Sequence, residues 1–384
     1  MAHNIYDVVV VGAGIEGSAT ANYLAKQGVK TLLLEQFPLP HSRGSSHGQS
    51  RITRKAYPEV FYTKMMLEAT DMWLELQNNF GCEIFRQSGF VSMGEYDGDV
   101  LMAVTQSLLQ LNTSHQVLTP SEFKTRFPMM KYPETFAGVL DFDGGLLRAD
   151  KALQAFQSEF TRHGGVIMDG CKVINIKPGL VVAIETPNAI FRGRKLVITA
   201  GPWASAVLKP LELDLPLKPV RISVCYWKER ECGSHSSGKL LPFYDVNGSA
   251  PYDIYGLPCE EYPGHVKICL HHGPEIDPDN RDGVPDSWVL DLITKYVRDH
   301  FPGLETCSPS IVETCIYTNT PDKHPILDKH PRWKNIIIGA GFSGHGFKLS
   351  PVVGKILGQF ALGETPSYDV TPFRIDRFKA LSRL

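Results

Sequence analysis

A glycine-rich turn near the N-terminus constrains this chain more than any other feature. It reads Gly12-Ala13-Gly14-Ile15-Glu16-Gly17 and lies between two apolar runs. The pattern predicts a strand over residues 6–11, a helix over 14–27 and a second strand over 30–35. Together these elements make one strand–helix–strand unit, the building block of doubly wound α/β domains.

The three glycines of this turn fit the binding of a dinucleotide. Gly12 permits the tight turn, Gly14 lets the backbone approach a pyrophosphate, and Gly17 allows close packing of helix and strand. The helix N-terminus then faces the anion. Glu35 follows 23 residues after Gly12, where a carboxylate accepts hydrogen bonds from a ribose diol and repels a 2′-phosphate. A glycine-rich loop without function is the alternative, and it leaves the position of Glu35 unexplained.

Two later segments also read as buried strands that run into glycines. Residues 196–203 end in a turn at Gly201, and residues 335–339 lead into a loop with several glycines. A helix is predicted after that loop, over 349–362. Because glycines let backbone approach a flat ligand closely, both strands are expected beside the cofactor. An ordinary strand–helix connection is the alternative for the second segment.

The length predicts two domains, since 384 residues exceed the roughly 250–300 at which a single core stops growing. The predicted fold class is α/β with an α+β second domain: a Rossmann-type cofactor domain that carries an inserted, mostly antiparallel β substrate domain. The cofactor domain is expected in three pieces, residues 1–80, 148–210 and 315–384. The substrate domain is expected in two pieces, residues 81–147 and 211–314.

The charge balance excludes several classes of partner. With 39 basic and 41 acidic residues the net charge is -2, so no overall field draws the chain to nucleic acid or to an anionic membrane. No apolar run approaches the roughly 18 residues of a membrane span. The eight cysteines contain no C-x-x-C pair, which argues against a metal site. A small-molecule partner is therefore expected.

The two ends of the chain bear on localisation. The N-terminus has no basic region followed by an apolar core, so no secretory signal is expected. An intracellular compartment is expected instead. The chain ends in Ser382-Arg383-Leu384, a conservative variant of the Ser-Lys-Leu address. This ending predicts the peroxisomal import receptor as a partner and the peroxisome as the location.

Two motifs suggest chemistry but leave alternatives open. Arg51 and Arg54 lie three residues apart, and on a helical turn they would share a face. One could grip a substrate carboxylate and the other could lie against a flavin, although a solvated basic turn fits the spacing equally well. Cys315 lies in a strand-like run over 311–318, and the residues alone favour a structural thiol there.

These segments resemble the monomeric sarcosine oxidase family, and most closely its vertebrate peroxisomal branch. The similarity runs from Asp7 to about Phe378. Its densest parts are HSRGSSHGQSRITRKAY at 41–57, LVITAGPW at 196–203, CIYTNTPD at 315–322 and GAGFSGHGFKLSPVVGKIL at 339–357. The resemblance implies FAD as the cofactor, an architecture like that of glycine oxidase and D-amino-acid oxidase, and a monomer.

The resemblance also implies roles for particular residues. Cys315 would be joined through sulfur to the 8α-methyl carbon of FAD. Arg54 and Lys348 would hold the substrate carboxylate, with Arg51 beside the isoalloxazine ring. Lys267 would lie over the other flavin face, where oxygen reacts. The residues expected to bind the cofactor are Gly12, Gly14, Gly17, Glu35, Ser50, Arg51, Gly201, Cys315, Gly341, Gly344, Gly346 and Lys348.

Tyr255 and His271 match the substrate-pocket residues of the family. The segment between Tyr255 and Lys267 is slightly longer than in bacterial members, and His272 adds a second imidazole, which leaves the substrate preference open. The expected reaction is oxidation of a small secondary amino acid (sarcosine, L-pipecolate or L-proline) to an imine, with O2 reduced to H2O2. The alternatives are an FAD-dependent dehydrogenase that passes electrons to a protein or quinone, and a nucleotide-binding protein without catalysis.

Overall fold

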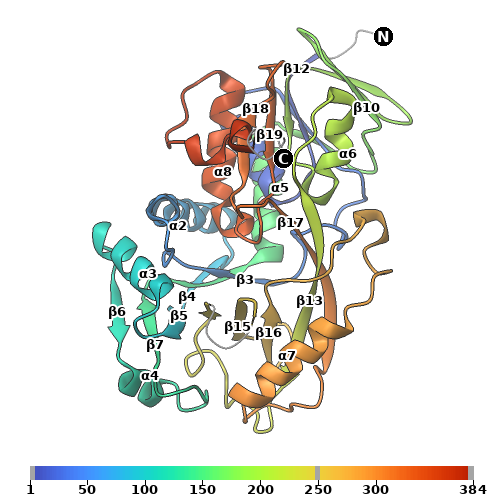
Figure 1. Cartoon of the computed structure of the whole chain (residues 1–384). Helices are drawn as coiled ribbons and strands as arrows, with labels where there is room; N and C mark the ends of the chain where they lie inside the picture. The colour runs from blue at the N-terminus through green and yellow to red at the C-terminus, as the bar shows by residue number, and fades with distance from the viewer. Residues whose placement is uncertain (1–4, 247–250, 379–384) are drawn as a thin grey trace.

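The computed structural model describes residues 5–246 and 251–378, which build two lobes (Figure 1). The upper lobe in Figure 1 holds an eight-stranded sheet in the order β10-β11-β12-β1-β2-β9, with β19 also paired to β12 and β18 at the edge. Its strands are β1 (Ile5–Val11), β2 (Thr31–Leu34), β9 (Val166–Met168), β10 (Asn175–Lys177), β11 (Val182–Glu185), β12 (Ile190–Ile198), β18 (Ile326–Lys329) and β19 (Ile336–Ala340).

The predicted strand–helix–strand unit at the N-terminus is confirmed. Strands β1 and β2 pair in parallel through Val8–Val11 and Thr31–Leu34, and α1 (Ile15–Lys26) connects them. Strands β12 and β19 extend the parallel part of the sheet on the other side of β1. The carboxyl ends of β1, β12 and β19 therefore meet at one edge, which is where open α/β sheets bind ligands.

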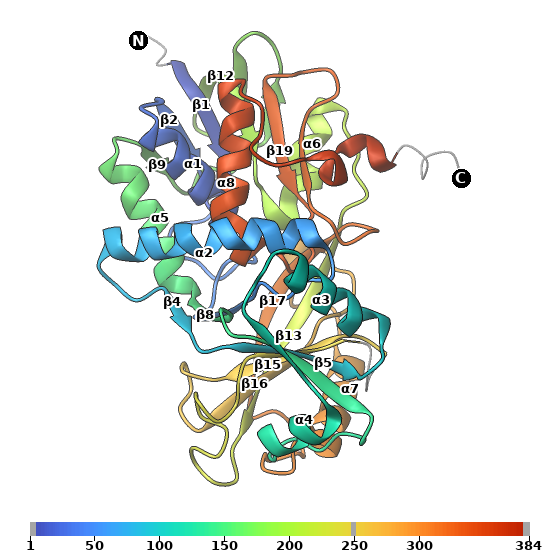
Figure 2. The ribbon, with the colours of Figure 1, turned by 90° about the vertical axis from the view of Figure 1, so that its left-hand side faces the viewer.

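Helices pack on both faces of this sheet. The helices of this lobe are α1, α2 (Val60–Phe80), α5 (Ala149–Arg162), α6 (Ala204–Leu208) and α8 (Gly346–Leu362), and Figure 2 shows α2 crossing below α8. Helices α1, α2, α5 and α8 pack on one face of the sheet, and the short α6 packs on the other face. A Cβ atom at Gly354 of α8 would lie 2.7 Å from the backbone of Ala19 in α1. The helix predicted over 349–362 is confirmed, and its glycines allow this close approach.

The lower lobe holds a second eight-stranded sheet, in the order β17-β13-β16-β15-β14-β5-β7-β6. All its pairs are antiparallel except β14 with β5, so the expectation of a mostly antiparallel second sheet is confirmed. Its strands are β5 (Phe90–Glu95), β6 (His115–Leu118), β7 (Phe136–Asp141), β13 (Lys218–Lys228), β14 (Phe243–Asp245), β15 (Ile254–Pro258), β16 (His265–Leu270) and β17 (Ile311–Asn319). Its helices are α3 (Asp99–Gln110), α4 (Pro120–Arg126) and α7 (Ser287–His300).

A small three-stranded sheet lies between the lobes, and its pairing shows that one expectation about residues 50–53 is wrong. It contains β3 (Ser50–Thr53), β8 (Gly145–Arg148) and β4 (Phe85–Gln87). The helical turn considered for Arg51 and Arg54 is wrong, because residues 50–53 pair with β8 as an antiparallel strand. Extended backbone turns side chains three residues apart to opposite sides, so the two guanidinium groups do not share a face.

The domain boundaries stay a prediction. Strand β17 crosses the boundary expected at 314/315 and pairs with β13 of the second sheet along its whole length. In the described ranges no helix is long and apolar enough to cross a membrane. The C-terminal address Ser382-Arg383-Leu384 lies outside the described residues.

Candidate active site

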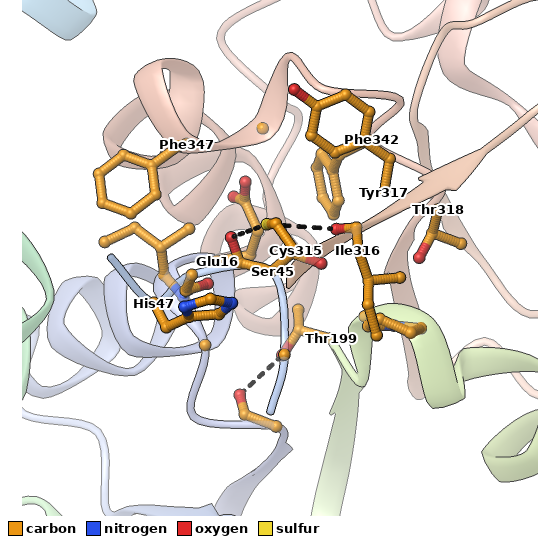
Figure 3. A pocket seen from close by; sticks show the side chains of 18 of the residues that line it. Glu16, Ser45, His47, Thr199, Cys315, Ile316, Tyr317, Thr318, Phe342 and Phe347 are labelled. Carbon is orange, nitrogen blue, oxygen red and sulfur yellow. Dashed lines mark hydrogen bonds between the residues drawn. The ribbon is translucent and has the colours of Figure 1, made fainter. Parts of the chain in front are cut away.

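A cavity of about 540 Å³ lies where the two large sheets meet, and both sheets contribute to its lining (Figure 3). It begins at the carboxyl ends of β1 and β12 and continues past β17 to the start of α8. All the residues expected to bind cofactor or substrate line it, with one exception. The exception is Gly17, whose Cβ atom would lie 1.8 Å from the carbonyl oxygen of Gly12, so that its role is packing.

The glycine turn packs directly against the end of β12, with no space for a side chain at Gly12. Gly12 has φ +101°, and a Cβ atom there would lie 2.4 Å from the carbonyl oxygen of Thr199. Beyond Gly14, the first turn of α1 receives support from the neighbouring loop, because the Ile15 amide donates to Ser46 Oγ at 2.9 Å. A glycine turn that leads into a helix N-terminus in this way is a common binding place for a pyrophosphate.

Glu35 lies at the end of β2 beside this turn. Its carboxylate accepts hydrogen bonds from the amides of Ala13 (2.9 Å) and Phe37 (3.1 Å), and His41 Nε2 lies 3.5 Å away. Burial acts to raise the pKa of Glu35, but these partners outweigh burial and lower it. The carboxylate is therefore ionised, and its remaining lone pairs can accept from a ribose diol.

Cys315 reaches the cavity from the middle of β17. The side chain is 6% exposed, and its Sγ lies 3.8 Å from the carbonyl oxygen of Ser45, as Figure 3 shows. The same loop is held in place by Arg51, whose guanidinium donates to the carbonyl groups of Ser45, His47 and Ser50. The thiol and the guanidinium thus come together at one wall of the cavity.

Arg54 is buried and Lys348 is half-buried, and among the described residues neither of these basic side chains has a carboxylate partner. The Arg54 guanidinium lies 4.4 Å from the ring centre of Tyr57 and 4.6 Å from that of Tyr244. Burial, and then the charges of Arg54 and Arg51, lower the pKa of Lys348 to about 7. Because buried charges are normally paired, this arrangement calls for an anionic ligand.

The walls beside these cations are aromatic. His271 packs against Tyr317 (4.9 Å between ring centres), Tyr244 (5.6 Å) and Tyr255 (6.0 Å). Burial, and then the charges of Lys348 and Arg54, lower the pKa of His271 to about 3. The imidazole is therefore neutral, and the space it borders suits a small apolar body that carries one anionic group.

The loop before α8 passes close to this aromatic wall. Gly344 has φ +84°, and a Cβ atom there would lie 2.5 Å from His271 Nε2. The Ser343 hydroxyl accepts from the Thr320 amide at 3.1 Å, which fixes the loop to the segment after β17. Gly341 and Gly346 line the cavity on either side of this contact. That the backbone of this loop approaches a ligand stays a prediction.

Lys267 is paired, which the sequence did not predict. Its ammonium lies 3.4 Å from Glu261 Oε1 and 3.3 Å from Ser50 Oγ, and the Lys267 and Glu261 side chains are 5% and 3% exposed. Ser50 also donates to Glu261. Burial acts to raise the pKa of Glu261, but Lys267 and Ser50 outweigh burial and lower it. The sequence shows that Glu261 lies in the loop before β16. Whether its carboxylate reaches Lys267 depends on how that loop folds.

Two further residues escaped the sequence analysis. Glu16, inside the glycine turn, is 7% exposed, and neither carboxyl oxygen has a hydrogen-bond partner among the described residues. His47 Nε2 is also buried without a partner, and burial, followed by Arg51 and Arg281, lowers the pKa of His47 to about 4. Both side chains line the cavity (Figure 3). Unpaired buried polar atoms of this kind indicate a ligand that satisfies them.

The protonation state of Glu16 follows from two opposed effects. It lies in the first turn of α1, where the helix N-terminus favours an anion by up to about 2 kcal/mol. Burial of an unpaired ion costs several kcal/mol. Burial raises the pKa of Glu16 well above its usual value, so we infer that the carboxyl is neutral.

The residues that line the cavity fit FAD. The glycine cradle, the ionised Glu35 and the glycine loop before α8 lie along one continuous space. No group of three or more His, Cys, Asp or Glu side chains in the described residues could hold a metal ion. The cofactor that this lining can hold is therefore an organic dinucleotide.

Comparison with known proteins agrees with this geometry. The family model of the FAD dependent oxidoreductases matches residues 7–360. The chain is 47% identical to human peroxisomal sarcosine oxidase, over 99% of this chain and 98% of the relative. It is 33% identical to the monomeric sarcosine oxidase of Bacillus sp. strain NS-129, over 97% of each chain. The crystal structure of glycine oxidase from Geobacillus kaustophilus shares the fold, with a TM-score of 0.79 at 19% identity over 97% of this chain and 98% of that chain.

Proposed function

The chain belongs to the FAD-dependent oxidoreductases, and within them to the sarcosine oxidases, and on that premise we propose that it oxidises a small secondary amino acid with O2. The candidate substrates are sarcosine, L-pipecolate and L-proline. The products are an imine and H2O2. Bound FAD supplies the chemistry by accepting two electrons from the substrate and passing them to O2.

The observation that carries this proposal is a buried arginine beside a half-buried lysine, neither with a carboxylate partner among the described residues. Arg54 and Lys348 can grip a substrate carboxylate, Arg54 through its planar fork and Lys348 as a point charge. This grip fixes the carbon next to the substrate nitrogen relative to the cofactor, which removes the entropy of orientation from the reaction. The aromatic wall around His271 supports the assignment, because it borders the same cavity with aromatic side chains.

The same charges select the protonation state of the substrate amine. Two cations close to the amine oppose a positive charge on it, and the neutral His271 offers no compensating anion. A neutral amine keeps the lone pair that assists cleavage of the adjacent C–H bond. The cation pair thus orients the carboxylate and also favours the reactive form of the nitrogen.

We also propose that Cys315 is joined through sulfur to the 8α-methyl carbon of FAD. Its burial at the cavity wall and its closeness to the loop ordered by Arg51 support this role. Lys267 is the proposed cation at which O2 is reduced, since a fixed charge stabilises an oxygen anion as it forms. The remaining predicted residues, apart from Gly17, are proposed as cofactor or substrate contacts, with Tyr255 and His271 in the substrate wall.

The peroxisome is the proposed location. The human relative is named for that organelle, and the ending Ser382-Arg383-Leu384 is a variant of the peroxisomal import address. Deletion of these three residues is expected to leave activity intact and to move a fluorescent fusion from peroxisomes to the cytosol. Unchanged import would remove the tripeptide from this role.

Oxygen consumption tests the proposed function. Sarcosine, L-pipecolate and L-proline are each added in air while O2 uptake and H2O2 formation are recorded. We expect at least one of them to give H2O2 in equal amount to the O2 consumed. Turnover that needs a quinone or protein acceptor and consumes no O2 would instead establish the dehydrogenase alternative.

A further inference from the structure

Glu16 is a buried carboxyl group that the proposed reaction does not use. It occupies a variable position of the glycine turn, between Gly14 and Gly17, in the first turn of α1. Its two oxygens are buried and have no hydrogen-bond partner in residues 5–246 and 251–378. The side chain lines the cavity together with Cys315 and Ser45 (Figure 3). A carboxyl group so placed can be satisfied by a ligand in that cavity.

The start of α8 approaches the same carboxyl group from the other side. A Cβ atom at Gly346 would lie 2.6 Å from Glu16 Oε1 and 2.9 Å from Cβ of Phe342. Gly346 therefore makes room for the Glu16 side chain between the N-termini of α1 and α8. Both helix ends border the cavity, so the Glu16 side chain lies beside the glycine turn that would hold the pyrophosphate of the cofactor.

None of the surrounding titratable groups neutralises an ionised Glu16. His345 and Lys348 on the α8 side, His47 on the loop before β3, Arg51 on β3 and Cys315 on β17 border the same cavity. No hydrogen bond or ion pair joins any of these described groups to Glu16. Burial is the one cause that acts on the carboxyl group, and it raises its pKa. The neutral acid therefore has a proton to donate.

We propose that Glu16 binds FAD as a neutral carboxylic acid whose O–H donates a hydrogen bond to an oxygen of the pyrophosphate segment. Cofactor binding is then linked to one proton. An ionised Glu16 would oppose binding twice, because it repels the phosphate charge and lacks the donor. This inference rests on the proposed function only in taking FAD as the cofactor.

The linkage has a definite direction. Above the pKa of Glu16 in the FAD-free protein, the affinity for FAD falls by about tenfold per pH unit, since binding must restore the proton. Glu16→Gln keeps a donor of the same size and cannot ionise, so its affinity should not change over the same pH range. Glu16→Leu has neither charge nor donor, and its affinity should be pH-independent but roughly tenfold or more below that of Glu16→Gln.

The experiment measures FAD affinity against pH in the full chain. Protein free of cofactor is prepared with Cys315→Ser as the common background, so that binding stays reversible, and FAD binding is followed by quenching of flavin fluorescence. The Cys315→Ser chain is compared with versions that also carry Glu16→Gln or Glu16→Leu. A sloping profile for the parent and flat profiles for both variants are expected.

An infrared measurement supplies a second readout that does not depend on the variants folding. At neutral pH the Cys315→Ser chain without a Glu16 substitution should show the infrared carbonyl band of a protonated carboxyl group. This band should shift when FAD is added. A parent profile as flat as that of Glu16→Gln, or the absence of such a band, would overturn the inference while FAD binding itself stands. A chain that binds no FAD at any pH would overturn the proposed function as well.

Discussion

At the scale of single residues, the proposed covalent bond to FAD is formed by the sulfur of Cys315, which lies at the cavity wall. Cys315→Ala is expected to release its flavin when the protein is precipitated with acid, because no bond to the cofactor remains. The parent protein should keep its yellow colour in the pellet. Cys269, a second buried thiol, provides the matched control, and Cys269→Ala should keep the colour too. Flavin that stays in the Cys315→Ala pellet would remove Cys315 from this role.

The carboxylate grip gives a prediction about substrate selectivity. Arg54→Met removes the guanidinium but leaves a side chain that can pack against Tyr57 and Tyr244. Losing one charge-assisted contact in a site without water costs about 2–5 kcal/mol, so the Michaelis constant for sarcosine should rise by roughly 30-fold or more. A secondary amine of matched size without a carboxylate should be oxidised nearly as before. Equal losses for both compounds would assign Arg54 a structural role instead.

Lys348 gives a pH dependence whose sign can be stated. Its pKa is lowered to about 7, first by burial and then by Arg54 and Arg51. A carboxylate ligand that does not itself titrate near neutrality, such as methoxyacetate, binds the protonated ammonium. Its affinity should therefore be constant well below pH 7 and should fall as the pH rises through 7. Titrations followed by the flavin spectrum check this, and a slope that persists in Lys348→Met would contradict it.

The chain sequence predicted some of these residues and concealed others. Arg54, Lys348 and Cys315 lie in long matching segments, so their positions could be transferred from the family. Glu16 occupies a variable position of the glycine turn, where the motif carries no information about the side chain. Glu261 accepts a hydrogen bond from Ser50, which lies far away in the chain and reaches Glu261 only in the folded protein. Pairings of this kind depend on tertiary structure.

At the scale of elements, the contact between β1 and α1 depends on Gly17. A Cβ atom there would lie 1.8 Å from the backbone oxygen of Gly12, and backbone cannot give way cheaply. Gly17→Ala should lower the free energy of unfolding by about 3 kcal/mol and should also reduce flavin content, since the cradle moves. Urea unfolding and the ratio of flavin to protein absorbance measure the two effects.

Gly28→Ala is the matched control for this change. Gly28 has φ +74° and no atom within 4 Å of its Cβ position, so alanine there costs only the backbone strain of about 1–2 kcal/mol. Its flavin content should be normal. If both variants lose flavin equally, the packing role of Gly17 is wrong.

The elements themselves were largely readable from the sequence, with one instructive failure. Periodicity and glycine turns located β1, α1, β2, β19 and α8. The segment around Arg51 was considered as a helical turn, and it is a strand because β8 pairs with it from a distant part of the chain. Short segments with β-branched residues such as Ile52 and Thr53 take their structure from the partner that they meet.

At the scale of the whole molecule, the two halves of the proposed reaction use different parts of the structure. The carboxylate grip comes from the segment after β3 and from α8, whereas Lys267 lies on β16 of the second sheet. Replacing Lys267 alone would leave Glu261 as an unpaired buried anion, which costs about 3–5 kcal/mol. The useful variant is therefore Lys267→Met combined with Glu261→Gln.

This double variant should separate the two half-reactions. Loss of the fixed cation is expected to slow the reaction of the reduced protein with O2 by on the order of 10²-fold, while reduction by saturating substrate changes far less. Stopped-flow absorbance measures each step. The Glu261→Gln variant alone controls for the lost carboxylate. A double variant that is impaired mainly in reduction, and that reacts with O2 at the parent rate, would refute the role of Lys267.

The central claim is that this cavity brings a small secondary amino acid to FAD. Anaerobic addition of sarcosine, L-pipecolate or L-proline to the purified protein, with flavin absorbance recorded, tests it most directly. The account predicts that at least one of the three bleaches the flavin stoichiometrically and that the absorbance returns when O2 is admitted. A flavin that stays fully oxidised with saturating concentrations of all three would contradict it.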